Sequence, residues 1–288
     1  MRRKERAPDP GIALDYPVTP RARYGWDQPS HHGLEAIISP GIERYRAVLE
    51  GFLAHRDRLS TISADAPVDP GDPRWLNDFI PGLDGVALYS FVADTRPALY
   101  LEVGSGNSTK FVKRAINDQR LDTQIVSIDP HPRAEVDALC DEVIRLPVED
   151  ADLAVFDRLE AGDVLFIDNS HRAFQNSDAT VMLTEVVPAL PAGVLVGIHD
   201  IFLPDDYPPQ WGDRYYSEQY LLAAWLLGGG GGAEVVLPAH YIRRFPDLDA
   251  ICDPIWSAPG LAEVQRHGGA FWFRTGKGYD RVAMTAYS

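Results

Sequence analysis

Cysteine is scarce in this sequence of 288 residues. Only Cys140 and Cys252 occur, and they lie far apart along the chain. Their spacing matches neither a metal-ligand motif nor a redox motif, so the sequence excludes cysteine-rich metal sites and Cys-x-x-Cys chemistry. We expect both thiols to be reduced and structural.

Long apolar runs are also lacking. No apolar stretch reaches the roughly 18 residues that a membrane-spanning helix needs. The N-terminus is basic, but no apolar segment follows it, so the pattern of a secretory signal is missing. We therefore expect no membrane partner and a cytoplasmic location.

Positive charge is in short supply. The chain has 27 Lys and Arg residues against 42 Asp and Glu residues, a net charge of −15. Basic residues gather only at the extreme N-terminus and at Arg243-Arg244. A nucleic-acid partner needs clustered Lys and Arg to contact phosphates. The balance excludes that partner and predicts a small-molecule substrate.

Short apolar runs alternate with helical segments from residue 98 onward. Several of the runs are almost continuously apolar, which is typical of parallel strands covered on both faces. Such alternation predicts an α/β fold with a doubly wound sheet. The strands are predicted at residues 98–103, 124–128, 142–146, 163–167 and 193–198, with two more at 234–237 and 270–274.

The residues before this region have a different pattern. Residues 1–30 are rich in Pro, Arg and Asp and are predicted to form an extended arm, and residues 60–75 are predicted to form a loop. We divide the chain into an N-terminal arm with cap helices, 1–80, and a main domain, 81–288. Helical periodicity predicts helices over 42–53, from 82 to about 92, over 110–116 and over 217–227.

A glycine-containing segment, Leu101–Thr109, follows the first predicted strand. Gly104 and Gly106 at a strand-to-helix turn let the backbone approach a ligand, and the following helix offers free N–H groups. Thr109 stands where a dinucleotide fingerprint needs a third glycine, and Gly-Lys-Ser/Thr is missing, so neither a dinucleotide nor a P-loop motif is present.

Asp129 ends the second predicted strand. A carboxylate at that position can accept hydrogen bonds from both hydroxyls of a ribose. The loop, the strand and the acid together indicate a nucleoside-containing cofactor. The alternative is a plain turn that Asp129 caps before Pro130.

Leu101–Thr109 resembles the first motif of the class I S-adenosylmethionine-dependent methyltransferases, and Val126–Asp129 is similar to their second. The resemblance implies a seven-stranded, mostly parallel sheet with one antiparallel strand near the C-terminal edge. It implies that Asp129 holds the ribose and that the adenine pocket lies near 148–152. The remaining cofactor-binding residues that it implies are Glu102, Gly104, Ser105, Gly106, Ser108 and Asp168.

Two further strands end in polar side chains. One is followed by Asp168 and His171, and the other by His199 and Asp200. Ligands of open α/β sheets bind beyond the carboxyl ends of the strands, so we expect both groups to face the crevice of Gly104.

Three interpretations of these groups remain open. Asp168 and Asp200, with or without a histidine, can hold Mg²⁺ that orients a hydroxyl and lowers its pKa. Alternatively, His171 or His199 is a general base without a metal, with Asp200 as a further candidate for acceptor or support. In the third interpretation these residues only tie loops together.

The paired groups resemble small-molecule O-methyltransferases, including those that act on antibiotic sugars, and their cephalosporin-hydroxylase-like relatives. Some of these bind Mg²⁺ through acids after the fourth and fifth strands. An Asp-Asp or Asp-Asn pair is common after the fifth strand in such sites, whereas this chain has His199-Asp200.

The segment Phe202–Trp211 is aromatic, acidic and stiffened by prolines. Because it directly follows Asp200, we expect it to cover the substrate mouth as a lid or wall. Trp26, His31 and His32 of the arm can also reach the pocket, although such residues are more often packing or surface residues.

The sequence predicts methyl transfer from S-adenosylmethionine to an oxygen, or less readily a nitrogen, of a small metabolite, with natural-product biosynthesis as the setting. One alternative keeps the fold and cofactor but cyclises the cofactor or supports metal-dependent hydroxylation. Another is a non-catalytic binding module. The arm at residues 1–40 can wrap a second subunit, which makes a homo-oligomer one expectation.

Overall fold

The computed structural model describes residues 18–67, 69–132 and 134–278. The first part of the predicted arm therefore lies outside the described residues. Residues 18–31 contain neither helix nor strand, and the described part of 60–75 is likewise irregular, as predicted. Within the described residues, every helix is too short or too polar to cross a bilayer.

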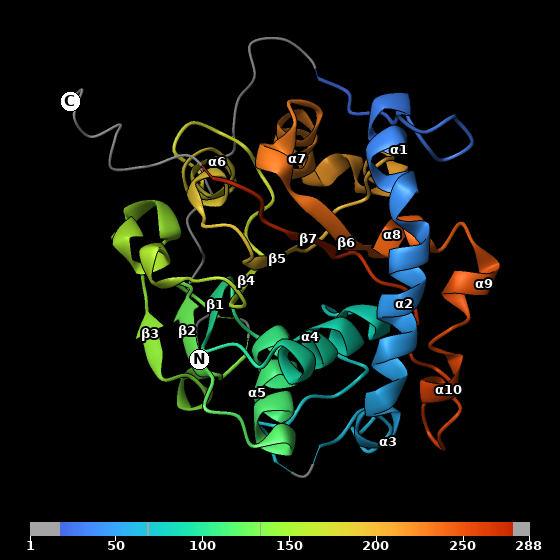
Figure 1. The fold of residues 1–288 in the computed structure, drawn as a ribbon, viewed down its shortest axis with the longest axis vertical. Helices are drawn as coiled ribbons and strands as arrows, with labels where there is room; N and C mark the ends of the chain where they lie inside the picture. The colour runs from blue at the N-terminus through green and yellow to red at the C-terminus, as the bar shows by residue number, and fades with distance from the viewer. Residues whose placement is uncertain (1–17, 68, 133, 279–288) are drawn as a thin grey trace, which may run out of the picture.

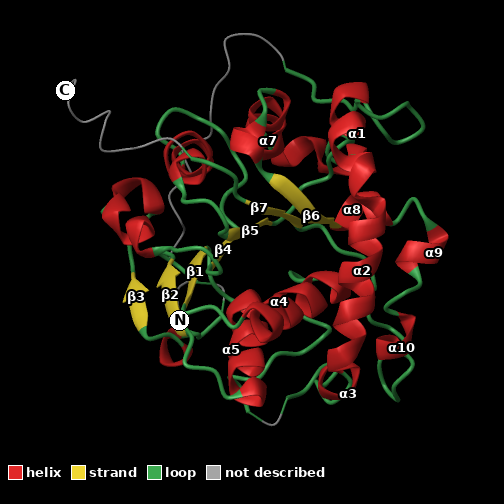
Figure 2. Ribbon diagram, in the orientation of Figure 1, coloured by secondary structure: helices red, strands yellow, loops and turns green. Residues whose placement is uncertain are grey.

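A seven-stranded sheet forms the centre of the molecule, as the apolar runs predict (Figures 1 and 2). The strand order is β3-β2-β1-β4-β5-β7-β6. All neighbours pair in parallel except β7, which is antiparallel to both β5 and β6. The strands are β1 Leu99–Val103, β2 Gln124–Ile128, β3 Glu142–Ile144, β4 Val164–Ile167, β5 Leu195–Ile198, β6 Glu234–Pro238 and β7 Phe271–Arg274.

Helices cover both faces of this sheet. Figure 1 shows α4 and α5 on one face and α6 and α7 on the other. The central strands β1, β4 and β5 are buried along their whole length, which explains their continuous apolar sequence. The bounds are α4 Gly82–Thr95, α5 Asn107–Gln119, α6 Asp178–Val181 and α7 Glu218–Leu227. The three helices predicted in this region begin and end within three residues of the prediction.

The cap helices lie at the β6 edge of the sheet. These are α1 His32–Ile38, α2 Ile42–Phe52 and α3 Arg56–Leu59. Helix α2 packs against β6, α1 against α7 and α3 against α10, Asp253–Trp256. Tyr45 and Leu49 of α2 are buried in the same apolar core as the strands. Arg44 Nε donates to the carbonyl of Val235 in β6 at 2.9 Å. The cap helices thus share the core of the main domain, and a domain boundary at residue 80 stays a prediction.

Three short helices complete the C-terminal region: α8 Ala239–Ile242, α9 Pro246–Asp249 and α10 Asp253–Trp256. They lie between β6 and β7, near α2 and α3 (Figure 1).

The carboxyl ends of the parallel strands are linked by backbone hydrogen bonds. Gly104 N donates to Ile128 O, and Asp168 N donates to Val103 O at 2.8 Å. His199 N donates to Ile167 O at 2.9 Å. The segments that follow β1, β2, β4 and β5 therefore begin at one edge of the sheet, where the sequence predicts the site.

Candidate active site

The turn after β1 passes very close to the end of β4. Gly104 has a φ of +82°, in the left-handed region, and a Cβ at this position would lie 1.8 Å from the carbonyl oxygen of Asp168. Only glycine avoids both the backbone strain and the clash. The glycine of the motif therefore brings the loop against Asp168.

Glu102 lies behind this loop and does not face a cavity. It is fully buried, accepts a hydrogen bond from Thr109 Oγ1 at 2.5 Å and another from Tyr100 Oη at 3.1 Å. Burial raises the pKa of Glu102 to about 7, although hydrogen bonds from Ser108, Thr109 and Tyr100 lower it. Glu102 therefore fixes the loop to the first turn of α5.

Asp129 joins the loop to the end of β2. Its Oδ2 accepts from Ser105 N at 2.8 Å, and its Oδ1 accepts from His131 N at 2.7 Å. The second bond is the turn cap that the sequence left as an alternative. The same carboxylate also lines a cavity, so the cap does not remove it from a ligand's reach.

This first cavity, the cofactor-side cavity, has a volume of about 370 Å³, within the usual range of ligand sites. Of the predicted cofactor residues, Gly104, Ser105, Asp129 and Asp168 line it, whereas Glu102, Gly106 and Ser108 do not. The predicted adenine region contributes Val148 and Glu149. The full lining is Val103, Gly104, Ser105, Ile128, Asp129, Pro130, His131, Pro147, Val148, Glu149, Asp168, Asn169, Ser170 and Asp178.

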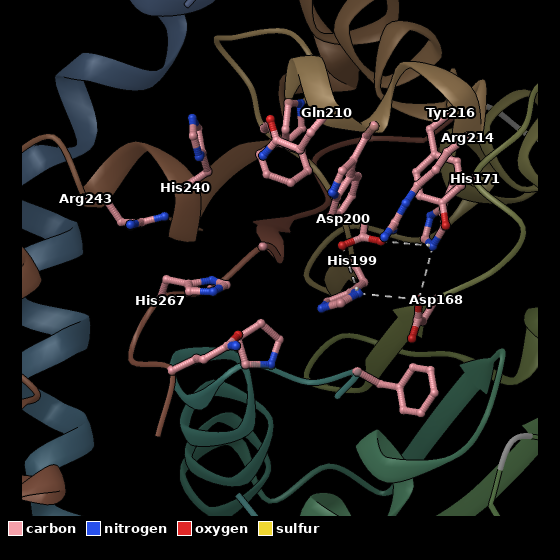
Figure 3. Close-up of a pocket in the computed structure, with 18 of the residues that line it drawn as sticks. Asp168, His171, His199, Asp200, Gln210, Arg214, Tyr216, His240, Arg243 and His267 are labelled. Carbon is pink, nitrogen blue, oxygen red and sulfur yellow. Dashed lines mark ion pairs between the residues drawn. The ribbon is translucent and has the colours of Figure 1, made fainter. Parts of the chain in front are cut away.

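Figure 3 shows a second and larger cavity of about 740 Å³, the substrate-side cavity. Asp168 lines both cavities. His171, His199 and Asp200, the three predicted catalytic residues, all line the larger one. The two cavities thus meet at the end of β4, next to the polar side chains that end β5.

His171 is held by carboxylates at both ring nitrogens. Its Nδ1 lies 2.9 Å from Glu218 Oε2, while its Nε2 lies 3.3 Å from Asp168 Oδ1 and 3.6 Å from Asp200 Oδ2. Burial lowers the pKa of His171, but Asp168 and Glu218 outweigh that effect and raise it to about 10. At neutral pH this ring is an imidazolium.

His199 is held in the same way. Its Nε2 faces Asp84 Oδ2 at 3.2 Å, and its Nδ1 faces Asp168 Oδ1 at 3.4 Å and Asp200 Oδ1 at 3.6 Å. Burial opposes the charged form, yet Asp168 and Asp200 raise the pKa of His199 well above its usual value. Asp84, fully buried in α4, also accepts from Gly269 N and Ala270 N.

The two aspartates that face the imidazoles differ. Burial works to raise the pKa of Asp168, but the charge of His199 and the contacts with both histidines lower it well below its usual range. Asp200 has a φ of +54°, an uncommon conformation that places its side chain in the cavity. Within the described residues, the carboxylate oxygens of Asp200 accept no hydrogen bond from the protein. They remain available to a ligand.

These donors are poorly suited to the predicted Mg²⁺ site. Mg²⁺ prefers an octahedral set of oxygen ligands, whereas Asp168 and Asp200 each face two imidazole nitrogens. Across residues 18–67, 69–132 and 134–278, no group of three or more His, Cys, Asp or Glu side chains has an arrangement suited to a metal ion. The donor set does not fit Mg²⁺.

The predicted lid lines the substrate-side cavity. Phe202, Pro208, Gln210 and Trp211 face it, together with Trp26 of the arm. Trp26 is anchored because its Nε1 donates to the carbonyl of Asp206 at 2.9 Å.

The other two arm residues do not line this cavity. His31 caps α1, since its Nδ1 accepts from Leu34 N, and His32 begins that helix.

The acids that hold the histidines, Asp84 and Glu218, were not predicted. Asp84 is the buried carboxylate of the apolar helix α4, and a buried acid in such a helix needs a partner, which is the signal in the sequence that could have identified it. Glu218 begins α7, where the sequence indicates only the start of a helix. Burial raises its pKa despite His171. Arg243 and His267 also line the cavity and were not predicted.

Residues 101–201 match the model of a family described as a methyltransferase domain. No curated protein sequence matches the chain.

Several solved structures are similar. A methyltransferase of Podospora anserina bound to S-adenosylhomocysteine has 17% identity, a TM-score of 0.37, and coverage of 69% of this chain and 90% of that one. An O-methyltransferase of Bacillus cereus has 15% identity, a TM-score of 0.33, and coverage of 80% and 90%. The O-methyltransferase TomG of Streptomyces achromogenes, involved in tomaymycin synthesis, has 15% identity, a TM-score of 0.33, and coverage of 68% and 80%.

The strand order, the single antiparallel strand and the glycine loop after β1 agree with the fold that the resemblance implies. Residues 101–201 thus match the model of a methyltransferase domain, and the chain has the seven-stranded, mostly parallel sheet that the resemblance to the class I S-adenosylmethionine-dependent methyltransferases implies.

Proposed function

We propose that this protein transfers the methyl group of S-adenosylmethionine to a hydroxyl oxygen of a small metabolite. The observation that carries the proposal is the position of Asp168 in the walls of both cavities. A cofactor in the smaller cavity and an acceptor in the larger one meet at that carboxylate. Natural-product intermediates are the first acceptors to test.

The residues of the smaller cavity suit the cofactor. Asp129 offers a carboxylate to the ribose, Gly104 and Ser105 provide backbone beside the methionine part, and Val148 offers an apolar surface to the adenine. The bound cofactor supplies a methyl carbon on a sulfonium: the C–S bond breaks with its electron pair going to sulfur as the acceptor oxygen forms the new C–O bond.

The protein's tasks are then alignment, exclusion of water and removal of the hydroxyl proton. We assign the last task to Asp200. Both histidines have carboxylates at each ring nitrogen and carry a proton at neutral pH, so neither can accept another. The low pKa of Asp168 makes it a poor proton acceptor.

His171 and His199 act as positioning residues in this proposal. Each imidazolium faces both Asp168 and Asp200 and is itself oriented by a buried acid, Glu218 or Asp84. This network holds two neighbouring carboxylates close together by placing positive charge between them. Transfer in this scheme needs no Mg²⁺, so EDTA should leave turnover unchanged.

The test begins with S-adenosylhomocysteine binding, measured by calorimetry, and continues with S-adenosylmethionine and a library of hydroxylated metabolites, with products identified by mass spectrometry. S-adenosylhomocysteine together with a product 14 mass units heavier than the acceptor is expected, because a methyl group replaces a hydrogen atom. Methylthioadenosine would instead indicate cyclisation of the cofactor. Absence of any adenosyl ligand binding would contradict the proposal and favour a non-catalytic module.

A further inference from the structure

One end of the substrate-side cavity is lined by arginine and histidine side chains. Arg243 follows α8, and His267 lies just before β7. Figure 3 shows both at the end opposite Asp168 and His171, with their side chains directed into the cavity. His240 lines the same region. The reacting carboxylates and these groups therefore occupy opposite ends of one space.

Arg243 differs sharply from its neighbour in the chain. The guanidinium of Arg244 contacts Asp205 and Ser30 and lies 3.1 Å from Glu35 Oε2, so it ties the arm and the lid together. The backbone N–H of Arg243 donates to the carbonyl of Tyr241 at the end of α8, but within the described residues its guanidinium forms no hydrogen bond or ion pair. A protein with a net charge of −15 has many acids to pair with an arginine, yet this guanidinium stays unpaired in a cavity wall.

His267 strengthens this end of the cavity. Burial, together with the nearby charge of Arg243, lowers the pKa of His267, while Asp84 opposes the shift. The ring is therefore neutral at pH 7. It can donate one hydrogen bond to a ligand, but it adds no second positive charge beside Arg243. His240 has its Nε2 3.0 Å from Asp205 Oδ2, so that nitrogen is already satisfied.

Aromatic rings also line this cavity. Trp211, Tyr216 and Phe202 face it, and the centre of the Tyr216 ring lies 4.7 Å from that of His171, at the reacting end. The guanidinium of Arg214 lies over Trp211, 3.9 Å from the ring centre. Such walls favour a flat or apolar body over a highly hydrated one.

We propose that the methyl acceptor is an anion: a hydroxylated, flat or apolar molecule with a carboxylate or phosphate group remote from the methylated hydroxyl, bound by Arg243 with His267. A guanidinium forms two parallel hydrogen bonds with such groups, which fixes direction as well as affinity. The acceptor hydroxyl is thereby directed toward Asp200. This inference rests on the proposed function, because it places the hydroxyl beside the methyl donor.

The test measures binding, so it does not depend on finding the natural acceptor. Calorimetry is run in saturating S-adenosylhomocysteine with 4-hydroxybenzoate, 4-hydroxyphenylacetate and 4-hydroxycinnamate, each against its primary amide. Phenyl phosphate is compared with benzyl alcohol in the same way, to test a phosphate group in place of the carboxylate. At least one anion should bind the native protein about tenfold more tightly than its neutral partner, as expected for a charge-assisted pair.

Two variants complete the experiment. Arg243→Gln should abolish the advantage of the anion. Arg266→Gln should keep it, because Arg266 is equally exposed but pairs with Asp253 at 2.9 Å outside the cavity. Equal binding of every anion and its neutral partner, or an advantage that persists in Arg243→Gln, would overturn the inference.

Failure of the inference can be told apart from failure of the proposed function. S-adenosylhomocysteine binding is measured in the same samples before the anions are added. If that ligand binds and no anion is preferred, only the substrate class is wrong. If that ligand does not bind at all, the methyl-transfer proposal fails.

Discussion

The cofactor-side and substrate-side cavities are built from different kinds of sequence. The first consists of segments that directly follow β1, β2, β3 and β4. The second shares the strand ends after β4 and β5 but also draws on the arm, the loop before α4, the lid, α8 and the residues before β7, which are spread from Trp26 to Gly269. In the proposed function, the cofactor lies against local strand-end turns, whereas the methyl acceptor also contacts loops that only the tertiary fold brings together.

The two cavities should differ most clearly in their response to a change at Asp200, which lines only the substrate-side cavity. In Asp200→Asn, kcat should fall by about 10²–10⁴-fold because the amide cannot accept the proton. Asparagine tolerates the left-handed backbone, so the fold is kept. Steady-state kinetics and calorimetry together test this. S-adenosylhomocysteine affinity should match that of the native protein, and Asp213→Asn, a variant of an exposed acid just after the lid, should keep full turnover.

A change at Asp129 should affect the opposite cavity. Asp129→Ala removes the carboxylate from the cofactor-side wall, and S-adenosylhomocysteine should bind about 10–100-fold more weakly. Asp122→Ala, an exposed acid just before β2, serves as the control. Unchanged affinity in Asp129→Ala, measured by calorimetry, would contradict the assignment of the ribose ligand.

The pH dependence of turnover distinguishes the two kinds of proton acceptor. Because both imidazoles keep their protons well above neutrality, log(kcat/KM) should be flat from about pH 6 to 9, measured with an acceptor that does not titrate there. A general-base histidine would instead give a tenfold loss per pH unit below about 6.5.

The variant Glu218→Gln tests the same assignment through the pKa of His171. It removes one of the acids that raise the pKa of His171, so His171 should lose its proton at lower pH and an inflection should enter the profile. A profile identical to that of the native protein would exclude Glu218 as a positioning residue.

The last expected effect is on stability. The folded-state pKa of His171 is about 10 and its unfolded value is about 6.5, so the folded state binds more protons between these values. The contribution of this site is complete below about pH 6.5 and is lost as pH rises through about 10, by at most about 1.4 kcal/mol per pH unit. Denaturant unfolding at several pH values measures it. A free energy of unfolding that rises over this range would contradict a protonated His171.

The sequence predicted the centre of the sheet well because β1, β4 and β5 are nearly continuous apolar runs, as strands covered on both faces must be. It also placed Gly104, Asp129, Asp168, His171, His199 and Asp200 at one edge, since strand ends converge there. It did not reveal that Glu102 lies behind the loop, because an acid that ends a strand looks the same whether it faces a ligand or the core.

The protonation state of His171 and His199 also could not be predicted from the sequence. It depends on Asp84 and Glu218, which lie 115 and 47 positions from their partners. Arg243 was noted only as part of a basic pair. What separates it from Arg244 is the set of acids around each guanidinium, which only the tertiary structure supplies.

The shared wall at Asp168 has a thermodynamic consequence. A ligand that alters the charge or position of this carboxylate from one side changes the affinity of the other side. By thermodynamic linkage, if the first ligand changes the affinity of the second by some factor, the second changes the affinity of the first by the same factor. Acceptor affinities should therefore be determined in the presence of the adenosyl ligand, and the coupling factor obtained in either order of addition should be the same.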